Sequence, residues 1–222
     1  MRSIRLMNGK WNEIKNSLLA VITVSSGIIT SIGISFYTTL VCSGAFLKIP
    51  RNFVGIDSQE VMVDYYRLVI FLMSFTRKKF KFNQVPMSQS AIQHFADVHC
   101  LTQAGELVTM LCGLLFITFF HYEKKRYQLW RLVPLFKQAL ILISVLTCLF
   151  LASFQDSFLY FHEVVFQNND WVFDPKTDPI ILILTENYFI YYLLVWLDLA
   201  LFLILIIIWI TETLVNLFFR RG

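Results

Sequence analysis

Charged residues are scarce in this chain of 222 residues. They make up 15% of the sequence, against roughly 25% in ordinary soluble domains, whereas hydrophobic residues make up 57%. The apolar residues are concentrated in long runs. Such runs are typical of helices that span a membrane rather than of a large soluble core. The composition therefore predicts an integral membrane protein.

Several common site motifs are also missing. The four cysteines form neither a Cys-x-x-Cys pair nor a Cys/His zinc spacing, which argues against a disulfide framework and a structural metal site. There is no glycine-rich phosphate loop or extended basic helix, so we do not expect nucleic-acid binding. The Gly-x-Ser-x-Gly elbow of serine hydrolases and the His-Glu-x-x-His motif of zinc proteases are absent as well. The sequence thus predicts no bound metal and no cofactor.

Four apolar stretches are long enough to cross a bilayer, which takes roughly 20 residues. The first lies in a segment without any charge, residues 16–47. We therefore predict an all-α membrane protein with four transmembrane helices. The expected spans are Leu18–Leu40, Cys100–Phe120, Leu132–Phe154 and Tyr188–Ile210.

Basic residues predict the orientation of these spans. Clusters precede the first span, fill the short turn between the second and third, and follow the fourth; such clusters mark the cytoplasmic side. Both termini are then cytoplasmic. The outer run Arg77–Lys81 is also basic, which a long loop tolerates, and is either a solvated face or a surface for anionic lipid headgroups. The clusters comprise Arg2, Arg5, Lys10, Lys15, Lys124, Lys125, Arg126, Arg131, Arg220 and Arg221.

This orientation divides the chain into five regions, of which two outer segments form an extracytoplasmic cap. The apolar stretch Tyr66–Phe75 is too short to span and should be an interfacial or re-entrant helix against the outer leaflet. The regions are the N-terminus and first span (1–40), the cap segment (41–98), the second and third spans with their basic cytoplasmic turn (99–154), an extracytoplasmic loop (155–187), and the fourth span with the C-terminus (188–222).

Two histidines lie on the outer side, at the two ends of one transmembrane hairpin. His94 precedes the second span and His162 follows the third. A short turn joins these spans, so they are antiparallel neighbours and the two histidines should lie close together. Asp97 shares a helical face with His94, where a carboxylate can hold the imidazole in one tautomer. Taken alone, an interfacial histidine is more often structural than catalytic.

Acidic residues supply further candidates. The segment 170–179 contains two Asp-Pro pairs, which is typical of a rigid turn, and Trp171 would lie at headgroup level. From spacing alone, a structured loop and a functional site are equally good interpretations of it. Glu106 and Asp198 lie within spans, where a carboxylate is costly and by default a functional candidate. Structural pairing with a Ser, a Tyr or Lys137 on another helix is the competing interpretation, and for Asp198 the two are equally good.

Three sequence elements occur in a characteristic order. They are His94-Phe95-x-Asp97-Val98, then Phe161-His162, then Trp171-x-Phe173-Asp174-Pro175-x-x-Asp178-Pro179-Ile180-Ile181. Together they resemble the bacterial lipoprotein intramolecular transacylase family, Lit, and the similarity extends over nearly the whole chain. The chain departs from that pattern in the segment 185–189, where Pro before Glu186 and Phe in place of Tyr188 are expected. The resemblance therefore assigns no role to Glu186.

The resemblance implies a particular reaction at the outer leaflet of the bacterial cell membrane. The sn-2 acyl chain of a diacylglyceryl-cysteine lipoprotein moves from glycerol to the α-amine of the same cysteine and leaves a lyso-form lipoprotein. Ester and amine belong to one molecule, so proximity can supply much of the barrier reduction. A base with a pKa near 7 frees the protonated amine. The expected partners are lipoproteins and membrane lipids.

The resemblance also implies roles for individual residues. His94 would be the principal base or a transient acyl acceptor, oriented by Asp97, and His162 would be a proton donor or an oxyanion stabiliser. A further group would shape the pocket and hold the peptide or its ammonium. This group comprises Trp171, Asp174 and Asp178.

Two alternatives stay open at this stage. A metal-dependent membrane hydrolase could use His94, Asp97, His162 and Glu163 as ligands, although this set depends on an assumed proximity. A non-enzymatic four-span scaffold would tolerate replacement of both outer histidines.

Overall fold

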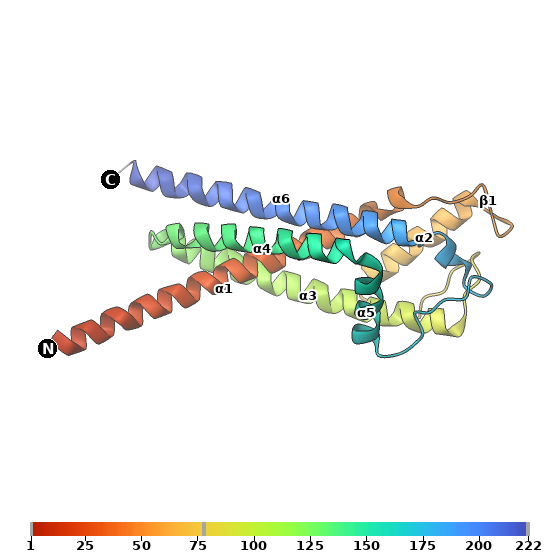
Figure 1. Ribbon diagram of the computed structural model, residues 1–222, viewed down its shortest axis with the longest axis horizontal. Coiled ribbons are helices and arrows are strands. Elements are labelled where there is room, and N and C mark those ends of the chain that lie inside the picture. Colours follow the sequence, from red (N-terminus) through yellow and green to blue (C-terminus); the bar gives the residue numbers. More distant parts are fainter. Residues whose placement is uncertain (1, 77–78, 221–222) are drawn as a thin grey trace. The chain divides into compact units, whose positions relative to one another are not determined.

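The computed structural model describes residues 2–76 and 79–220 (Figure 1). Arg77 and Lys78 of the outer basic run, and Arg221 of the C-terminal basic cluster, lie outside the described residues. The helices are α1 (Arg2–Cys42), α2 (Ser58–Leu72), α3 (Gln89–Lys125), α4 (Leu132–Ala152), α5 (Phe154–Phe166) and α6 (Glu186–Phe219). Short 3-10 turns occur at Ser43–Phe46, Leu129–Arg131 and Pro179–Leu182, and two strands, β1 (Asn52–Phe53) and β2 (Ile56–Asp57), complete the elements.

Within the described residues, four helices are long and apolar enough to cross a membrane: α1, α3, α4 and α6. This confirms the four predicted spans. α3 contains 37 residues, more than the roughly 20 that a bilayer requires. It begins at Gln89, so His94 and Asp97 lie on the same continuous helix as the second span, as expected.

The two outer segments contain more helix than the sequence analysis specified. α2 begins at Ser58, ahead of the expected start at Tyr66, because Asp57 caps it by accepting a hydrogen bond from the Gln59 amide. The third span was predicted to end at Phe154, but its helix, α4, ends at Ala152. After Ser153 the chain changes direction into α5 (Figure 1). The predicted loop 155–187 therefore starts as a helix.

The strands β1 and β2 form an antiparallel hairpin in which Asn52 pairs with Asp57. Its two turn residues, Val54 and Gly55, have φ angles of 55° and 80°. Left-handed geometry at both central positions defines the tight hairpin turn whose twist matches that of the strands. A β-branched residue is unusual at such a φ, so this turn stores some strain at the exposed tip.

The chain divides into two compact units. Unit 1 comprises Met1–Ile34, Val108–Leu146 and Asp198–Gly222, and unit 2 comprises Ser35–Leu107 and Thr147–Leu197. Both predicted catalytic histidines belong to unit 2.

Unit 1 is packed through small residues on α1. Ala20 and Val24 are buried against Phe136 of α4 and the α6 side chains Ile204 and Ile208. In membranes, small residues allow helix backbones to approach closely. The tightest example is Gly33, where an added Cβ would lie 2.0 Å from Thr109 Oγ1 and 2.8 Å from Thr109 Cβ. Because the threonine Cβ itself obstructs, rotation of that side chain cannot relieve the clash.

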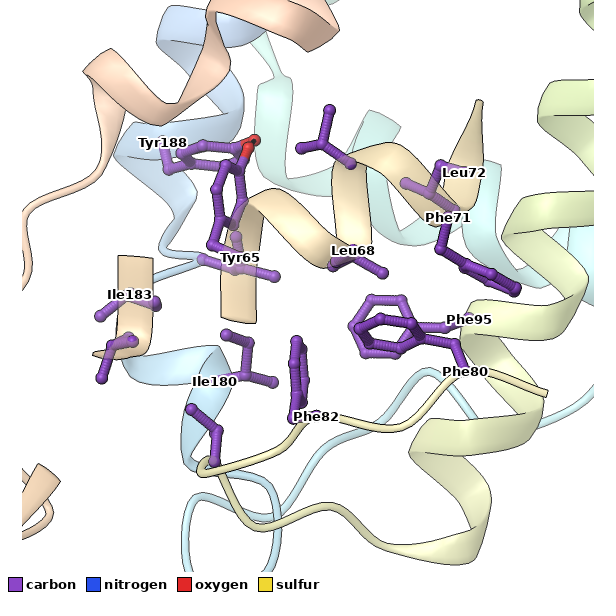
Figure 2. Packing of buried hydrophobic residues seen from close by; sticks show 14 of the residues in the cluster. Tyr65, Leu68, Phe71, Leu72, Phe80, Phe82, Phe95, Ile180, Ile183 and Tyr188 are labelled. Carbon is purple, nitrogen blue, oxygen red and sulfur yellow. Dashed lines mark hydrogen bonds between the residues drawn. The ribbon is translucent and has the colours of Figure 1, made fainter. Parts of the chain in front are cut away.

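Unit 2 has a core rich in aromatic side chains. Phe71 of α2 stacks on Phe80 with ring centroids 5.1 Å apart, and Phe82 and Phe95 meet edge to face at 5.9 Å. Figure 2 shows these rings directed toward one another from α2, α3 and the segment between them. The opposite face of α2 exposes Val63, Tyr66 and Ile70. This exposed apolar face agrees with an interfacial position.

Asp64 fastens the segment before α3 to α2. Its buried carboxylate accepts hydrogen bonds from the amides of Asn83, Gln84 and Val85 at 2.9, 2.7 and 3.1 Å, and from Arg67 at 3.0 Å. Burial opposes ionisation, but these four donors outweigh it and lower the pKa of Asp64 below its ordinary value. Asp64 therefore stabilises the fold in its ionised form.

We expect Gly33→Ala to destabilise unit 1 by about 1–3 kcal/mol through overpacking. The matched control is Gly113→Ala, because a Cβ there lies 3.6 Å from Thr30 Cγ2, an ordinary contact. Thermal unfolding in detergent should show a lower Tm for the first variant and an unchanged or higher Tm for the second. Equal Tm values for both variants would contradict the close approach at Gly33.

We expect Asp64→Asn to lower stability at pH 7 by about 1–3 kcal/mol, because buried donors lose their charged acceptor. The folded pKa is lowered, so this contribution is present above the unfolded value of about 3.9 and disappears as pH falls through the folded pKa. Thermal unfolding at several pH values measures it, with exposed Asp156→Asn as the control. A stability difference that persists undiminished below the folded pKa would contradict this account.

Candidate active site

His94 and His162 lie side by side in unit 2. α3 carries His94 and α5 carries His162, and their ring centroids are 6.0 Å apart. The proximity expected from the hairpin is thus present in the structure. Aromatic rings enclose the pair: Phe166 packs against both imidazoles at 4.8 and 5.5 Å, and Phe173 packs edge-on against His94 at 5.5 Å. The two histidines therefore lie in a largely apolar setting.

His94 is 8% exposed, and its Nδ1 atom has no hydrogen-bond partner among the described residues. Buried polar atoms are nearly always hydrogen-bonded, and an unpaired one carries a desolvation penalty. An active site is one place where such a penalty persists, because a substrate group can supply the missing partner. The protein itself thus leaves Nδ1 of His94 buried and unpaired among the described residues.

His162 has a defined tautomer. Its Nδ1 lies 2.8 Å from the carbonyl oxygen of Phe158, and since a carbonyl only accepts, Nδ1 must carry the hydrogen. Nε2 of the neutral ring then keeps its lone pair and can act as a base. Burial lowers the pKa of His162 below its ordinary value, although the Phe158 carbonyl acts in the opposite direction. His162 is therefore held neutral at physiological pH.

Asp97 has a different set of partners from the one expected. Its two carboxylate oxygens accept hydrogen bonds from Gln93 Nε2 at 2.9 Å and Asn168 Nδ2 at 3.1 Å. Within the described part of the chain, no hydrogen bond joins Asp97 to His94. Asp97 connects α3 to the segment after α5 and does not hold the imidazole directly.

The segment after α5 contributes Trp171 to the site. The indole ring lies 5.1 Å from the His162 ring, and its Nε1 donates to the Asn168 carbonyl at 2.8 Å. Trp171 therefore lies beside His162, and its role in shaping a pocket stays a prediction.

The other two supporting carboxylates are engaged with the protein. Asp178 is buried and accepts from the Ser88 amide at 2.6 Å and from Thr177 Oγ1 at 2.8 Å. It thereby anchors the start of α3, where Ser88 caps the helix. Asp174 is exposed and accepts from the Lys176 amide at 2.9 Å in a turn. A role for either carboxylate in holding an ammonium stays a prediction.

Glu106, the carboxylate of the second span, makes no hydrogen bond or ion pair with either histidine among the described residues. Lys137, proposed from sequence as a partner for Asp198, instead pairs with Glu212 at 2.6 Å. The pairing of Asp198 with Lys137 was therefore wrong, because Lys137 pairs with another carboxylate of α6. Within residues 2–76 and 79–220, no group of three or more His, Cys, Asp or Glu could hold a metal ion. The metal-dependent alternative thus finds no ligand set there.

Four side chains of the site were not predicted from sequence: Gln93, Phe158, Phe166 and Asn168. One signal was available. Phe158, His162 and Phe166 recur at intervals of four, which places them on one helical face, but α5 was expected to be loop. The bond between Asn168 and Asp97 joins positions 71 residues apart and has no local sequence signal.

A family model described as lipoprotein intramolecular transacylase Lit matches residues 15–189. The chain belongs to this family. It is accordingly an acyltransferase of the membrane, and the transacylation of lipoproteins is its function. No curated protein matches the chain.

Solved structures support the same fold. One is the membrane-integral Lit of Bacillus cereus, with a TM-score of 0.80 and 20% identity over 95% of this chain and 100% of that one. A variant of that protein with a histidine replaced by arginine has a TM-score of 0.81 at 19% identity, covering 97% and 99%. A variant with histidine replaced by alanine gives 0.80 at 20%, covering 97% and 100%. The chain therefore has the fold of these Lit structures over nearly all of its length.

We expect His162 to titrate below the ordinary histidine pKa of about 6.5, since the imidazole is buried beside Phe158, Phe166 and Trp171. NMR of the histidine-labelled protein in detergent measures this, with the signal assigned by its loss in His162→Gln. The shifts should also report hydrogen on Nδ1. A signal that titrates at or above about 6.5, or with hydrogen on Nε2, would contradict the described environment.

Proposed function

We propose that the His94–His162 pair is the catalytic centre of this Lit transacylase. Its substrate is a diacylglyceryl-cysteine lipoprotein, and the sn-2 acyl chain moves to the α-amine of the same cysteine. The observation that carries the proposal is the pairing itself. Two imidazoles from separate helices lie 6.0 Å apart, one with an unpaired Nδ1 and the other with Nε2 free to accept a proton.

The location of the site supports a substrate held in the membrane. α5 exposes a set of apolar side chains, which is typical of helices that lie in the lipid interface. The basic clusters near the span ends support cytoplasmic termini, and the histidine pair then faces the outer leaflet. Lipids of that leaflet would contact α5. The exposed apolar side chains are Leu159, Tyr160, Phe161, Val164 and Val165.

The tautomer of His162 supports its assignment as the base. Nε2 of His162 takes a proton from the α-ammonium, and the freed amine attacks the sn-2 ester carbonyl. The N–C bond forms, and the bond between the acyl carbon and the glycerol oxygen breaks. The nitrogen loses two of its three protons: Nε2 releases the first to solvent, and the second passes through Nε2 to the glycerol oxygen. This reverses the roles that the resemblance implied, in which His94 was the base and His162 the proton donor. Nδ1–H of His162 already donates a hydrogen bond to the Phe158 carbonyl, so Nε2 is the atom that can accept a proton.

His94 is assigned the role of stabilising the negative charge that develops on the carbonyl oxygen. In the tautomer with hydrogen on Nδ1, its unpaired nitrogen can donate to the carbonyl oxygen as it becomes an oxyanion.

The aromatic surroundings contribute to the same reaction. An ammonium group loses hydration beside Phe166 and Phe173, and desolvation favours its neutral, nucleophilic form. Both reacting groups belong to one molecule, so the enzyme mainly holds them in a reactive orientation, which can account for a large share of the barrier. No covalent protein intermediate is required.

We expect His94→Ala and His162→Ala each to lower lyso-lipoprotein formation by about 10²–10⁴-fold, the usual contribution of a general acid or base. Each variant is expressed with a diacyl lipoprotein, and mass spectrometry of the lipoprotein N-terminal peptide detects the N-acyl product. The matched control is His121→Ala, since His121 is exposed at the far end of α3.

The decisive comparison is between folded proteins. All three variants should be recovered from the membrane, and the control should match the unmodified enzyme. Full activity in either His94→Ala or His162→Ala would overturn the assigned centre.

A further inference from the structure

Asn168 makes three separate hydrogen bonds beside the histidine pair. Its Nδ2 donates to Asp97 Oδ2 at 3.1 Å, its Oδ1 accepts from the Asp170 amide at 3.0 Å, and its carbonyl accepts from Trp171 Nε1 at 2.8 Å. One residue thus joins α3, the turn after α5 and the indole that lies on His162.

The backbone on either side explains why the turn needs such an anchor. Gln167 ends α5 in the left-handed region, with φ 52° and ψ 24°, which is unfavourable for a residue with a Cβ. Strained conformations of this kind persist when surrounding contacts fix them, and they cluster at active sites. The Asn168 bonds begin at the very next residue.

The partner of Asn168 is itself held in place. Asp97 accepts from Asn168 with one oxygen and from Gln93, one helical turn earlier on α3, with the other. Hydrogen bonds to a carboxylate are stronger than those between neutral groups. Gln93, Asp97 and Asn168 therefore form a bridge from α3 to the turn, with a charged group in its centre.

The segment that follows Asn168 supplies an aromatic ring to the surroundings of each histidine. Trp171 lies 5.1 Å from His162, and Phe173, two residues later, lies 5.5 Å from His94. Displacement of the turn would move both rings and admit water beside Nε2 of His162.

We propose that Asn168 is a positioning residue of the transacylase, which acts by bridging Asp97 to Trp171 and so keeps the indole against His162. This inference rests on the proposed catalytic pair. It also gives Asp97 a function different from orienting His94: the carboxylate is the fixed point on α3 to which the turn is attached.

The first test is Asn168→Ala, with Asn169→Ala as the matched control. Asn169 is exposed, and its bond in this turn is made by its backbone carbonyl, which accepts from the Val172 amide and is kept in the variant. Purified variants act on a diacylglyceryl lipopeptide, and mass spectrometry follows the N-acyl product over a range of substrate concentrations. We expect kcat to fall by about 10–100-fold for Asn168→Ala, since small misplacements at a reacting centre have effects of this size. Asn169→Ala should stay within about twofold, below the level that a lost hydrogen bond produces.

A reciprocal exchange separates a positioning role from a general structural one. Asp97→Asn combined with Asn168→Asp rebuilds the bridge, since the new amide at position 97 donates to the new carboxylate at 168, which still accepts from the Asp170 amide. We expect the double variant to recover at least about tenfold of kcat relative to Asn168→Asp alone, where two carboxylates face each other. A double variant that folds yet recovers nothing would count against the bridge.

A double-mutant cycle tests the route through the indole. Trp171→Phe keeps an aromatic ring but cannot donate to the Asn168 carbonyl. If Asn168 acts through Trp171, the effects of Asn168→Ala and Trp171→Phe on kcat should be far from additive. Additive effects would overturn this route.

Failure of the inference can be distinguished from failure of the proposed function. Asn168→Ala with kcat within about twofold of the unmodified enzyme, less than one hydrogen bond accounts for, would overturn the inference alone. Activity that survives in His94→Ala and His162→Ala would overturn the catalytic pair. Thermal unfolding of every variant verifies that the compared proteins are folded.

Discussion

The packing of two neutral imidazoles against each other, His94 buried and His162 half-buried, is the constraint on which unit 2 depends. Charged histidines at 6.0 Å would repel, and an aromatic environment penalises the charge of either. The fold meets this constraint with one ring bonded to a backbone carbonyl and the other left with an unpaired nitrogen. The rest of the unit keeps α3, α5 and the following turn in register around this pair.

The chemistry follows from that neutrality. A transfer from ester to amine within one lipid-linked molecule requires neither a serine nucleophile nor a metal, because the acceptor is already tethered beside the donor. What it requires is the removal of two protons from the nitrogen, one of which is released and the other delivered to the glycerol oxygen, in a largely apolar site. His162 as a neutral base, His94 as the adjacent donor and the aromatic rings around them meet this requirement. Asp64 and Asp178, both buried, serve the enclosure by fixing the segment before α3 and the start of α3 itself.

Much of this could be predicted from sequence, for identifiable reasons. Long uncharged runs specify membrane spans whatever their neighbours are, and a short turn between spans forces their outer ends together, so the meeting of His94 and His162 followed from connectivity. The break at Ser153 did not follow, because a single serine between Ala152 and Phe154 is no signal that ends a helix. The partners of Asp97 were also missed: spacing places it on the face of His94, but its hydrogen bonds depend on where the turn at Asn168 lies.

The most direct test of the account is a structure of the enzyme with a non-reactive diacylglyceryl-cysteine analogue. The account predicts the α-amine nitrogen within hydrogen-bond distance, about 2.6–3.2 Å, of Nε2 of His162. It also predicts the sn-2 carbonyl oxygen, or its replacement, beside Nδ1 of His94. An analogue whose amine is held by Asp174 and whose carbonyl contacts neither histidine would contradict the account.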